Sequence, residues 1–163
     1  MPKNLKSKLR LDDVDRKLLH HLQQNGRLSF AELSRRVTLT TPAVIERVRK
    51  LEDAGIITGY RAEVNPAKLG LPIVAFIRIS VVGDVFVKVA AIAKDSAEVL
   101  ECHRGTGSDS FIMKVAVRSV QHLEELIDRL TPCGTTSTSI VLSSPVKRRD
   151  LVPWKSGDAG PRD

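Results

Sequence analysis

The stretch from residue 29 to residue 55, SFAELSRRVTLTTPAVIERVRKLEDAG, limits the possible folds of this chain more than any other. Apolar residues recur at spacings of three and four over residues 30–37, which predicts a short amphipathic helix. Its predicted apolar stripe is Phe30, Leu33 and Val37. Residues 38–41 interrupt this period, and Thr40 or Thr41 is suited to cap a second helix. The stretch therefore predicts two helices joined by a tight turn.

The second of these helices begins around Pro42, which favours the first turn, and is ended by Gly55. Its predicted buried stripe is Val44, Val48 and Leu51. A further helix is predicted over residues 12–24, ended by Asn25 and Gly26. Three short helices with this turn are typical of a helix-turn-helix unit, whose second motif helix lies in the DNA major groove. Residues 11–55 are thus predicted to form a DNA-binding domain.

The solvent side of the second motif helix carries side chains suited to reading DNA. The candidates for base-edge contacts are Thr40, Thr41, Ala43, Glu46 and Arg47. A glutamate accepts from cytosine, an arginine forks onto guanine, and an alanine or threonine methyl contacts thymine. The candidates for phosphate contacts are Arg27, Arg35, Arg36, Arg49 and Lys50. Because Arg47 lies closer to the buried stripe, its alternative role is to brace the domain.

The distribution of charge favours DNA binding over a purely structural helical module. Residues 1–60 hold 12 Lys and Arg against 7 Asp and Glu, so they carry most of the chain's net charge of +7. Residues 1–10 form a basic arm that contains Lys3, Lys6, Lys8 and Arg10. Such a concentration attracts phosphates and releases counterions on binding. The predicted partner is double-stranded DNA.

A second block alternates between the period of strands and the period of helices. The predicted order is strand, helix, strand, strand, helix, strand over residues 73–82, 84–94, 99–104, 111–117, 120–130 and 136–142. This order is that of the split βαβ, or ferredoxin-like, sandwich. The predicted fold class is α+β: an N-terminal three-helix helix-turn-helix domain followed by a ferredoxin-like βαββαβ sandwich. Residues 56–71 are predicted to be a hinge strand and linker, and residues 154–163 a flexible tail.

The two central strands of this sandwich are apolar on both faces. Val74 and Phe76 alternate with inward residues on the first strand, as Ile112 and Ala116 do on the third. Two helices cover one face of a sheet, so the other face needs a second partner. A second copy of the chain is the interpretation that we favour, and coverage by the N-terminal unit is the alternative.

Several other classes of function find no support in the sequence. No apolar run reaches the length of a membrane span, so a soluble, cytoplasmic and nucleoid-associated protein is expected. Cys102 and Cys133 are widely spaced and are interpreted as reduced thiols. There is no catalytic Ser/His/Asp grouping, phosphate-binding loop or metal-ligand spacing. The chain is therefore predicted to be no enzyme and to need no cofactor or metal.

Linked motifs make the chain similar to a known family. LDDVDRKLLHHLQQNGR, the motif ending in RVRKLEDAGII, the linker GYRAEVNPAKLG and the sandwich that follows resemble the Lrp/AsnC (leucine-responsive and asparagine-regulator, or feast/famine) transcriptional regulators. The resemblance covers about residues 10 to 153. It implies a sequence-specific transcriptional regulator modulated by an amino acid or related metabolite. It also implies an effector-binding and oligomerisation domain over residues 72–153, and a homodimer that can assemble into an octamer.

The family's signature loop corresponds here to Gly105, Thr106, Gly107, Ser108 and Asp109. Glycines let a backbone approach a ligand and present N–H groups to an α-carboxylate, while an aspartate pairs with an α-ammonium group. The resemblance therefore implies an effector-binding loop. The alternative is a tight turn in which glycine supplies positive φ.

Two features weigh on this interpretation. The chain reads Pro132-Cys133-Gly134-Thr135 where the family often has Pro-Gly-Val and an arginine. The family pattern therefore does not define this wall of the pocket here, nor which effector, if any, is bound. Siroheme decarboxylases resemble the same two-domain layout and give an alternative, enzymatic function. They carry a His/Tyr/Arg-rich segment where this chain has Glu101-Cys102-His103-Arg104. This segment matches the regulator pattern better.

Overall fold

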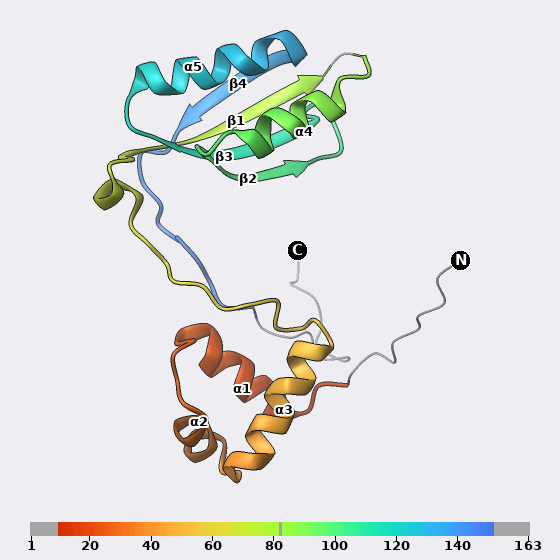
Figure 1. Ribbon diagram of the computed structural model, residues 1–163, viewed down its shortest axis with the longest axis vertical. Helices are drawn as coiled ribbons and strands as arrows, with labels where there is room; N and C mark the ends of the chain where they lie inside the picture. Colours follow the sequence, from red (N-terminus) through yellow and green to blue (C-terminus); the bar gives the residue numbers. More distant parts are fainter. Residues whose placement is uncertain (1–9, 82, 152–163) are drawn as a thin grey trace, which may run out of the picture. The chain divides into compact units, whose positions relative to one another are not determined.

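A computed structural model of the chain describes residues 10–81 and 83–151. These residues divide into two compact units. Unit 1 holds the described residues up to Ala62 together with those from Val146 onward, and unit 2 is Glu63–Pro145 (Figure 1). The predicted basic arm, apart from Arg10, and the predicted tail lie outside the described residues.

Unit 1 contains the three predicted helices. They are α1 (Asp13–Gln24), α2 (Phe30–Val37) and α3 (Thr41–Asp53). Their apolar stripes meet in a small core that contains Leu18, Leu33, Val37, Val44 and Val48. The predicted helix-turn-helix is therefore confirmed, with α2 and α3 as its two members.

Local side-chain bonds set where α1 and α2 begin. In α1, Asp12 accepts from the N–H of Asp15 while Asp15 accepts from the N–H of Asp12, and Ser29 and Glu32 form the same reciprocal pair at α2. Thr38 ends α2 in the left-handed region at φ 57°. Thr40 occupies the cap position of α3, but its side chain makes no capping bond.

Residues 54–72 contain a single 3₁₀ turn (Pro66–Leu69) and no strand, so the predicted hinge strand is not formed in this chain alone. The segment 146–151 returns to α1. There the amide of Gln23 donates to the carbonyl of Leu151 (3.0 Å) and accepts from its N–H (2.8 Å). His20 and Asp150 approach to 3.7 Å beside this pair. The sequence analysis places this segment at the end of the second domain, and in the structure its last residues also bond to α1 of unit 1.

Unit 2 is a four-stranded antiparallel sheet with two helices on one face (Figure 1). Its elements are β1 (Ile73–Val81), α4 (Phe86–Asp95), β2 (Val99–Arg104), β3 (Phe111–Val117), α5 (Val120–Leu130), a 3₁₀ turn (Thr131–Cys133) and β4 (Gly134–Ile140). The strand order β2-β3-β1-β4 places β1 and β3 at the centre, as the ferredoxin-like topology requires. The predicted fold class is confirmed.

The two faces of this sheet differ in burial. Inward residues such as Ala75, Ile77 and Met113 are completely buried between the sheet and the helices. On the opposite face, Phe76 remains 40% exposed and Ile112 remains 39% exposed. In unit 2 taken by itself, this apolar face has no covering layer, as the alternation of the strands predicted.

Two element boundaries differ from the predicted ones. Helix α4 spans Phe86–Asp95 rather than 84–94, and β4 spans Gly134–Ile140 rather than 136–142, so both ends of each element differ. The shift of β4 has a steric cause. Gly134 pairs with Val81 at φ 157°, and a Cβ on it would lie 2.2 Å from the carbonyl oxygen of Ser80. Only a residue without a side chain lets the strand begin so close to β1.

Replacing Gly134 with alanine should therefore cost more than the loss of backbone freedom alone. The matched control is Gly70→Ala in the same unit, which also has a positive φ (81°) but has no neighbour within 4 Å of the added Cβ. We expect Gly134→Ala to lower the free energy of unfolding by roughly 1–3 kcal/mol more than the control does. Urea denaturation followed by circular dichroism measures both, and equal losses would contradict the steric account.

Candidate functional site

The outer side of α3 presents the predicted DNA-reading side chains to solvent. The side chains of Glu46, Arg49 and Lys50 are 58%, 74% and 60% exposed. Lys50 lies 3.4 Å from Glu46, and Arg49 lies 3.8 Å from Asp53. Exposed pairs of this kind contribute little to stability and are readily exchanged for other partners. The row of side chains is thus available to a polyanion.

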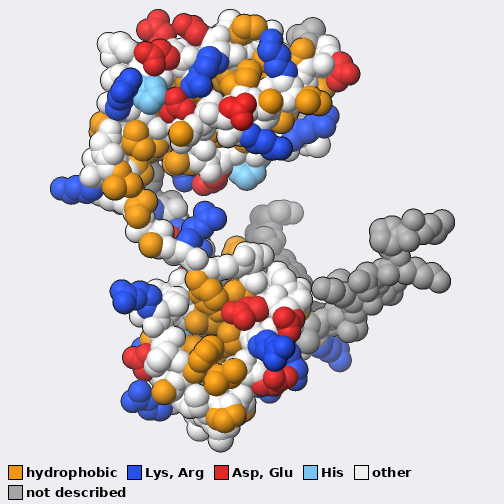
Figure 2. Space-filling model, viewed as in Figure 1, with side chains coloured by type: hydrophobic (Ala, Val, Ile, Leu, Met, Phe, Trp, Pro, Cys, Tyr) orange, Lys and Arg blue, Asp and Glu red, His pale blue; other side chains and the backbone are white. Residues whose placement is uncertain are grey.

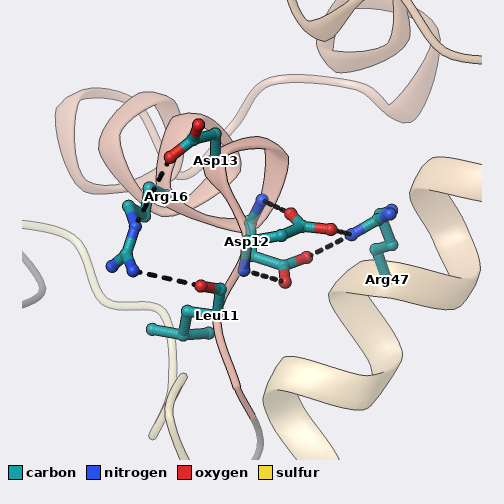
Figure 3. A network of polar contacts seen from close by, with 6 residues as sticks. Leu11, Asp12, Asp13, Arg16 and Arg47 are labelled. Atoms are coloured by element: carbon teal, nitrogen blue, oxygen red, sulfur yellow. Dashed lines mark hydrogen bonds and ion pairs between the residues drawn. The ribbon is translucent and has the colours of Figure 1, made fainter. Parts of the chain in front are cut away.

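Arg47 has a different environment from its neighbours on α3. Its Nη1 donates to Asp12 Oδ2 and to Asp15 Oδ1, both at 2.7 Å (Figure 3). The Asp15 side chain is only 11% exposed, so at least one of these pairs is shielded from water. The same two carboxylates form the capping box of α1. Arg47 therefore fastens α3 to the start of α1.

The electrostatics of this contact are reciprocal. The N–H of Asp15, followed by the guanidinium of Arg47, holds the pKa of Asp12 below its ordinary value. The two carboxylates in turn raise the pKa of Arg47. An arginine held this way positions the helix, and Arg47 is the one predicted base-reading residue whose geometry favours the alternative bracing role.

The remaining predicted DNA contacts are spread over unit 1. Arg27, Arg35 and Arg36 are exposed, and Arg35 Nε donates to the carbonyl of Ala31 at 3.2 Å. Thr41 is half-buried and bonds to Ser34 at 3.3 Å, so its hydroxyl is engaged within the motif. A shallow hollow of about 390 Å³ lies between the start of α1 and the outer side of α3. Its lining includes Arg10, Ala43, Glu46 and Lys50.

The predicted effector loop joins β2 to β3. The N–H of Gly105 donates to the carbonyl of Ser110 (3.0 Å), and the N–H of Ser110 donates to the carbonyl of Ile79 (2.8 Å). Asp109 Oδ1 lies 3.5 Å from the hydroxyl of Ser80. The loop is thus fastened to the end of β1, while residues 105–108 stay exposed.

Both glycines of this loop have a steric reason to be glycine. Gly107 has φ 102°, which side chains rarely adopt, and a Cβ on Gly105 would lie 3.1 Å from the carbonyl oxygen of Asp109. The geometry is that of a tight turn that keeps one carboxylate, that of Asp109, at its base.

A feature that the sequence analysis did not find is a hollow of about 540 Å³ between α4 and β2, open to solvent on one side and called the α4–β2 cavity below. Its apolar lining includes Phe86, Val87, Ala90, Val99, Leu100 and Phe111. The available signal was weak, because it consists of alanines at 90 and 93 on the apolar side of a helix opposite a strand at the sheet edge. Such a hollow becomes evident only when helix and strand are packed together.

Within residues 10–81 and 83–151, no group of three or more His, Cys, Asp and Glu side chains is arranged to hold a metal ion. Cys102 and Cys133 are free thiols. No helix in the described part of the chain is long and apolar enough to cross a membrane.

Comparison with known proteins finds a matching domain family for the N-terminal part and for the C-terminal part of the chain. Residues 11–52 match the AsnC-type helix-turn-helix domain, and residues 74–151 match the Lrp/AsnC ligand binding domain. The chain belongs to the Lrp/AsnC family. The resemblance recognised in the sequence is thereby confirmed over nearly the same residues.

Curated relatives of this Lrp/AsnC chain are named as regulators. An uncharacterized HTH-type transcriptional regulator from Bacillus subtilis, YezC, is 44% identical over 82% of this chain and 95% of its own length. The leucine-responsive regulatory protein of Escherichia coli K12 is 34% identical over 87% of this chain and 91% of its own length. This Lrp/AsnC protein is a transcriptional regulator and not an enzyme, so the siroheme-decarboxylase alternative is not supported.

Solved structures agree with the two-domain fold. The structure of LrpC from Bacillus subtilis has a TM-score of 0.82 at 30% identity and covers 86% of this chain and all of its own. A transcriptional regulator from Neisseria meningitidis in complex with L-Met has a TM-score of 0.82 at 32% identity, covering 87% of this chain and 96% of its own.

Removing the side chain of Arg47 should destabilise the helix-turn-helix unit of this regulator. We expect Arg47→Ala to lower the free energy of unfolding by about 1–2 kcal/mol at neutral pH, a charge-assisted contribution reduced by the partial exposure of Asp12. Arg49→Ala, which removes an exposed side chain from the same helix, is the control and should change stability by less than about 0.5 kcal/mol.

The effect of Arg47 should also depend on pH. The pKa of Asp12 is lowered in the folded state, so its contribution is complete above the unfolded pKa of about 4 and is lost as the pH falls through the folded pKa. The difference between wild type and Arg47→Ala should therefore shrink below about pH 4. Thermal unfolding measured from pH 7 down to pH 3 tests this, and a constant difference would count against the ion pair.

Proposed function

We propose that the regulator reads DNA with the outer side of α3, pairs as a homodimer through the open face of its sheet, and binds an amino acid at the loop 105–109. The observation that carries the DNA-reading role is the contrast within α3. Arg47 is fastened to α1, whereas Glu46, Arg49 and Lys50 are exposed in weak pairs. A helix that is fixed on one side and free on the other is suited to enter a groove.

Within this proposal some exposed side chains contact base edges and others contact phosphates. Glu46 and Ala43, near the start of α3, read base edges, the glutamate by accepting from a cytosine amino group. Arg49, Lys50, Arg27, Arg35 and Arg36 contact phosphates, aided by the basic arm of residues 1–10. Thr40 and Thr41 stand at the helix start, where a methyl group can meet thymine. Arg47 serves by holding α3 at its angle.

Single substitutions on α3 should distinguish side chains that recognise a base from side chains that contact phosphates. Lys50→Ala should weaken binding to all sequences alike and reduce the salt dependence, because a phosphate contact carries no sequence information. Glu46→Ala should instead change the preference at one base-pair position by roughly 1–3 kcal/mol. Binding to a library of operator variants, measured at two salt concentrations, distinguishes them. A uniform loss for Glu46→Ala would exclude its base-reading role.

The proposed dimer rests on the apolar centre of the open sheet face. Phe76 and Ile112 lie on the two central strands, each about two fifths exposed, and both helices of unit 2 cover the opposite face. Burying these side chains against a second copy removes them from water and gives a symmetric reader for paired half-sites. We further propose that such dimers can assemble into octamers and that the protein acts in the cytoplasm at the nucleoid.

Introducing a charge at this face should separate the copies. We expect Phe76→Glu to produce monomers at micromolar concentration and to abolish tight operator binding, since an unpaired buried charge is strongly unfavourable. Ala91→Glu, on the exposed side of α4, is the control and should remain associated. Sedimentation velocity on the full chain measures both, and a dimeric Phe76→Glu protein would rule out this interface.

The proposed effector site rests on the loop that joins β2 to β3. Two glycines leave its backbone accessible, and Asp109 supplies a carboxylate at its base. An amino acid offers the matching pair of groups, an α-carboxylate for backbone N–H donors and an α-ammonium group for the aspartate. Support comes from two similar proteins, the regulator from Neisseria meningitidis and a feast or famine regulatory protein from Mycobacterium tuberculosis, whose structures are complexes with L-methionine.

Removing the carboxylate at the base of the loop should impair sensing and leave the fold intact. Asp109→Ala is expected to lower amino-acid affinity by roughly 1.5–3 kcal/mol, and DNA binding should persist without its response to effector. Gly107→Val should be more damaging, because its φ of 102° disfavours a side chain. Calorimetry against the twenty amino acids tests both. Equal binding by the Asp109→Ala protein would reduce the loop to a structural turn.

A further inference from the structure

The cavity between α4 and β2 is separate from the proposed effector loop, because none of residues 105–109 lines it. It is formed where Ala90 and Ala93 on α4 face the edge strand β2. The register of β2 against β3 slips between Val99 and Glu101, and Leu100 at that irregularity is among the lining residues. Its volume of about 540 Å³ lies within the range of roughly 300–1,000 Å³ that is usual for small-molecule sites, and it is open to solvent on the side of Val87 and Leu100, which are 81% and 49% exposed.

The charged side chains around this cavity are mostly cationic. Arg104 and Lys94 line it, and within residues 10–81 and 83–151 neither has a carboxylate within 4 Å. Among the lining residues that the structure describes, Glu101 is the acidic one; its side chain is 51% exposed and lies 3.3 Å from Lys114. Burial raises the pKa of the Cys102 thiol, so the thiol also stays neutral. The side of unit 2 that carries α4 faces the viewer in Figure 2, where both basic and acidic side chains lie among apolar ones.

Arg104 is held in position by an aromatic side chain. Its guanidinium carbon lies 4.2 Å from the centroid of the Phe86 ring, and Phe86 lies 6.0 Å from Phe111 between centroids. A guanidinium that stacks on an aromatic face keeps its edge N–H groups free for a planar, bidentate acceptor. A carboxylate is such an acceptor.

From these observations we propose a second ligand site, in which the α4–β2 cavity binds an apolar monocarboxylate, such as a fatty acid or a branched 2-oxo acid, through Arg104. The apolar lining takes the hydrocarbon chain, Arg104 pairs with the carboxylate, and Lys94 adds a favourable field at the other end of α4. An α-ammonium group would meet Arg104 and Lys94, and the carboxylate of Glu101 already has Lys114 beside it, so the site favours acids without an ammonium group. In this it differs from the loop at Asp109.

Calorimetry with the full-length protein tests the site directly, using octanoate and 4-methyl-2-oxopentanoate as probes. Both acids should bind, whereas octylamine and leucine should not occupy this site. Arg104→Gln should weaken the binding of both acids about tenfold or more, and Ala90→Phe, which fills the cavity, should abolish it. Lys88→Gln, which removes a cation of α4 that does not line the cavity, is the matched control and should bind within about twofold of wild type.

A second measurement reports occupancy without any variant of the binding groups. Cys102 lines the cavity, whereas Cys133 is only 2% exposed, so the faster reaction with Ellman's reagent should belong to Cys102 and should be missing in Cys102→Ser. Bound octanoate should slow this reaction. The Asp109→Ala protein should keep both binding and protection, which separates this site from the effector loop.

Three results would overturn the proposal. They are the absence of binding by either acid, wild-type affinity in the Arg104→Gln protein, and wild-type affinity in the Ala90→Phe protein. If neither acid binds and Ala90→Phe instead changes the sedimentation coefficient, the α4–β2 cavity is part of an interface between copies of the chain.

Discussion

One-sided burial is the constraint on which both units of this regulator depend. Three short helices in unit 1 enclose a small apolar core, and two helices in unit 2 cover only one face of a four-stranded sheet. Small units of this kind leave a large fraction of their surface outside the core. In unit 1 that surface is a polar helix side, and in unit 2 it is a sheet face with Phe76 and Ile112 at its centre. The two surfaces therefore suit different partners, a polyanion and an apolar face.

The two arginines of α3 have different contacts because they lie on different sides of the helix. Arg47 and Arg49 are two positions apart, yet Arg47 meets two carboxylates at 2.7 Å while Arg49 is 74% exposed. A rotation of about 100° per residue separates the side that packs on α1 from the side that faces solvent. The carboxylates that receive Arg47 also cap α1. The same pair of side chains thus sets the start of one helix and the orientation of another, and this orients the exposed row for its task.

Much of this architecture could be predicted from the sequence because it follows from periodicity and local caps. The order of elements, the central position of β1 and β3, and the open apolar face were all predictable, and Leu33, Val48 and Ile77 are buried as expected. Phe30, placed on the same stripe as Leu33, is instead 43% exposed because it stands at the first position of α2. What could not be predicted depends on contacts between distant residues. The start of β4 depends on how closely Gly134 approaches Ser80. The role of Arg47 depends on Asp15 and Asp12, which precede it in the sequence by 32 and 35 positions. The α4–β2 cavity depends on alanines that are informative only when their opposite strand is in place. The roles of the DNA-reading and loop residues remain predictions.

The pairing of Gln23 with Leu151 has a mechanical consequence. Because residues 146–151 belong to unit 1, unit 2 is an insertion within it, and the chain crosses between the units once in each direction. Two bodies joined by a single tether can swivel about that tether without resistance. Two bodies joined by a pair of tethers wind the tethers around each other when one body turns, and the turn is resisted once the slack is used. The returning tether ends on Gln23, at the opposite end of α1 from the carboxylates that hold Arg47.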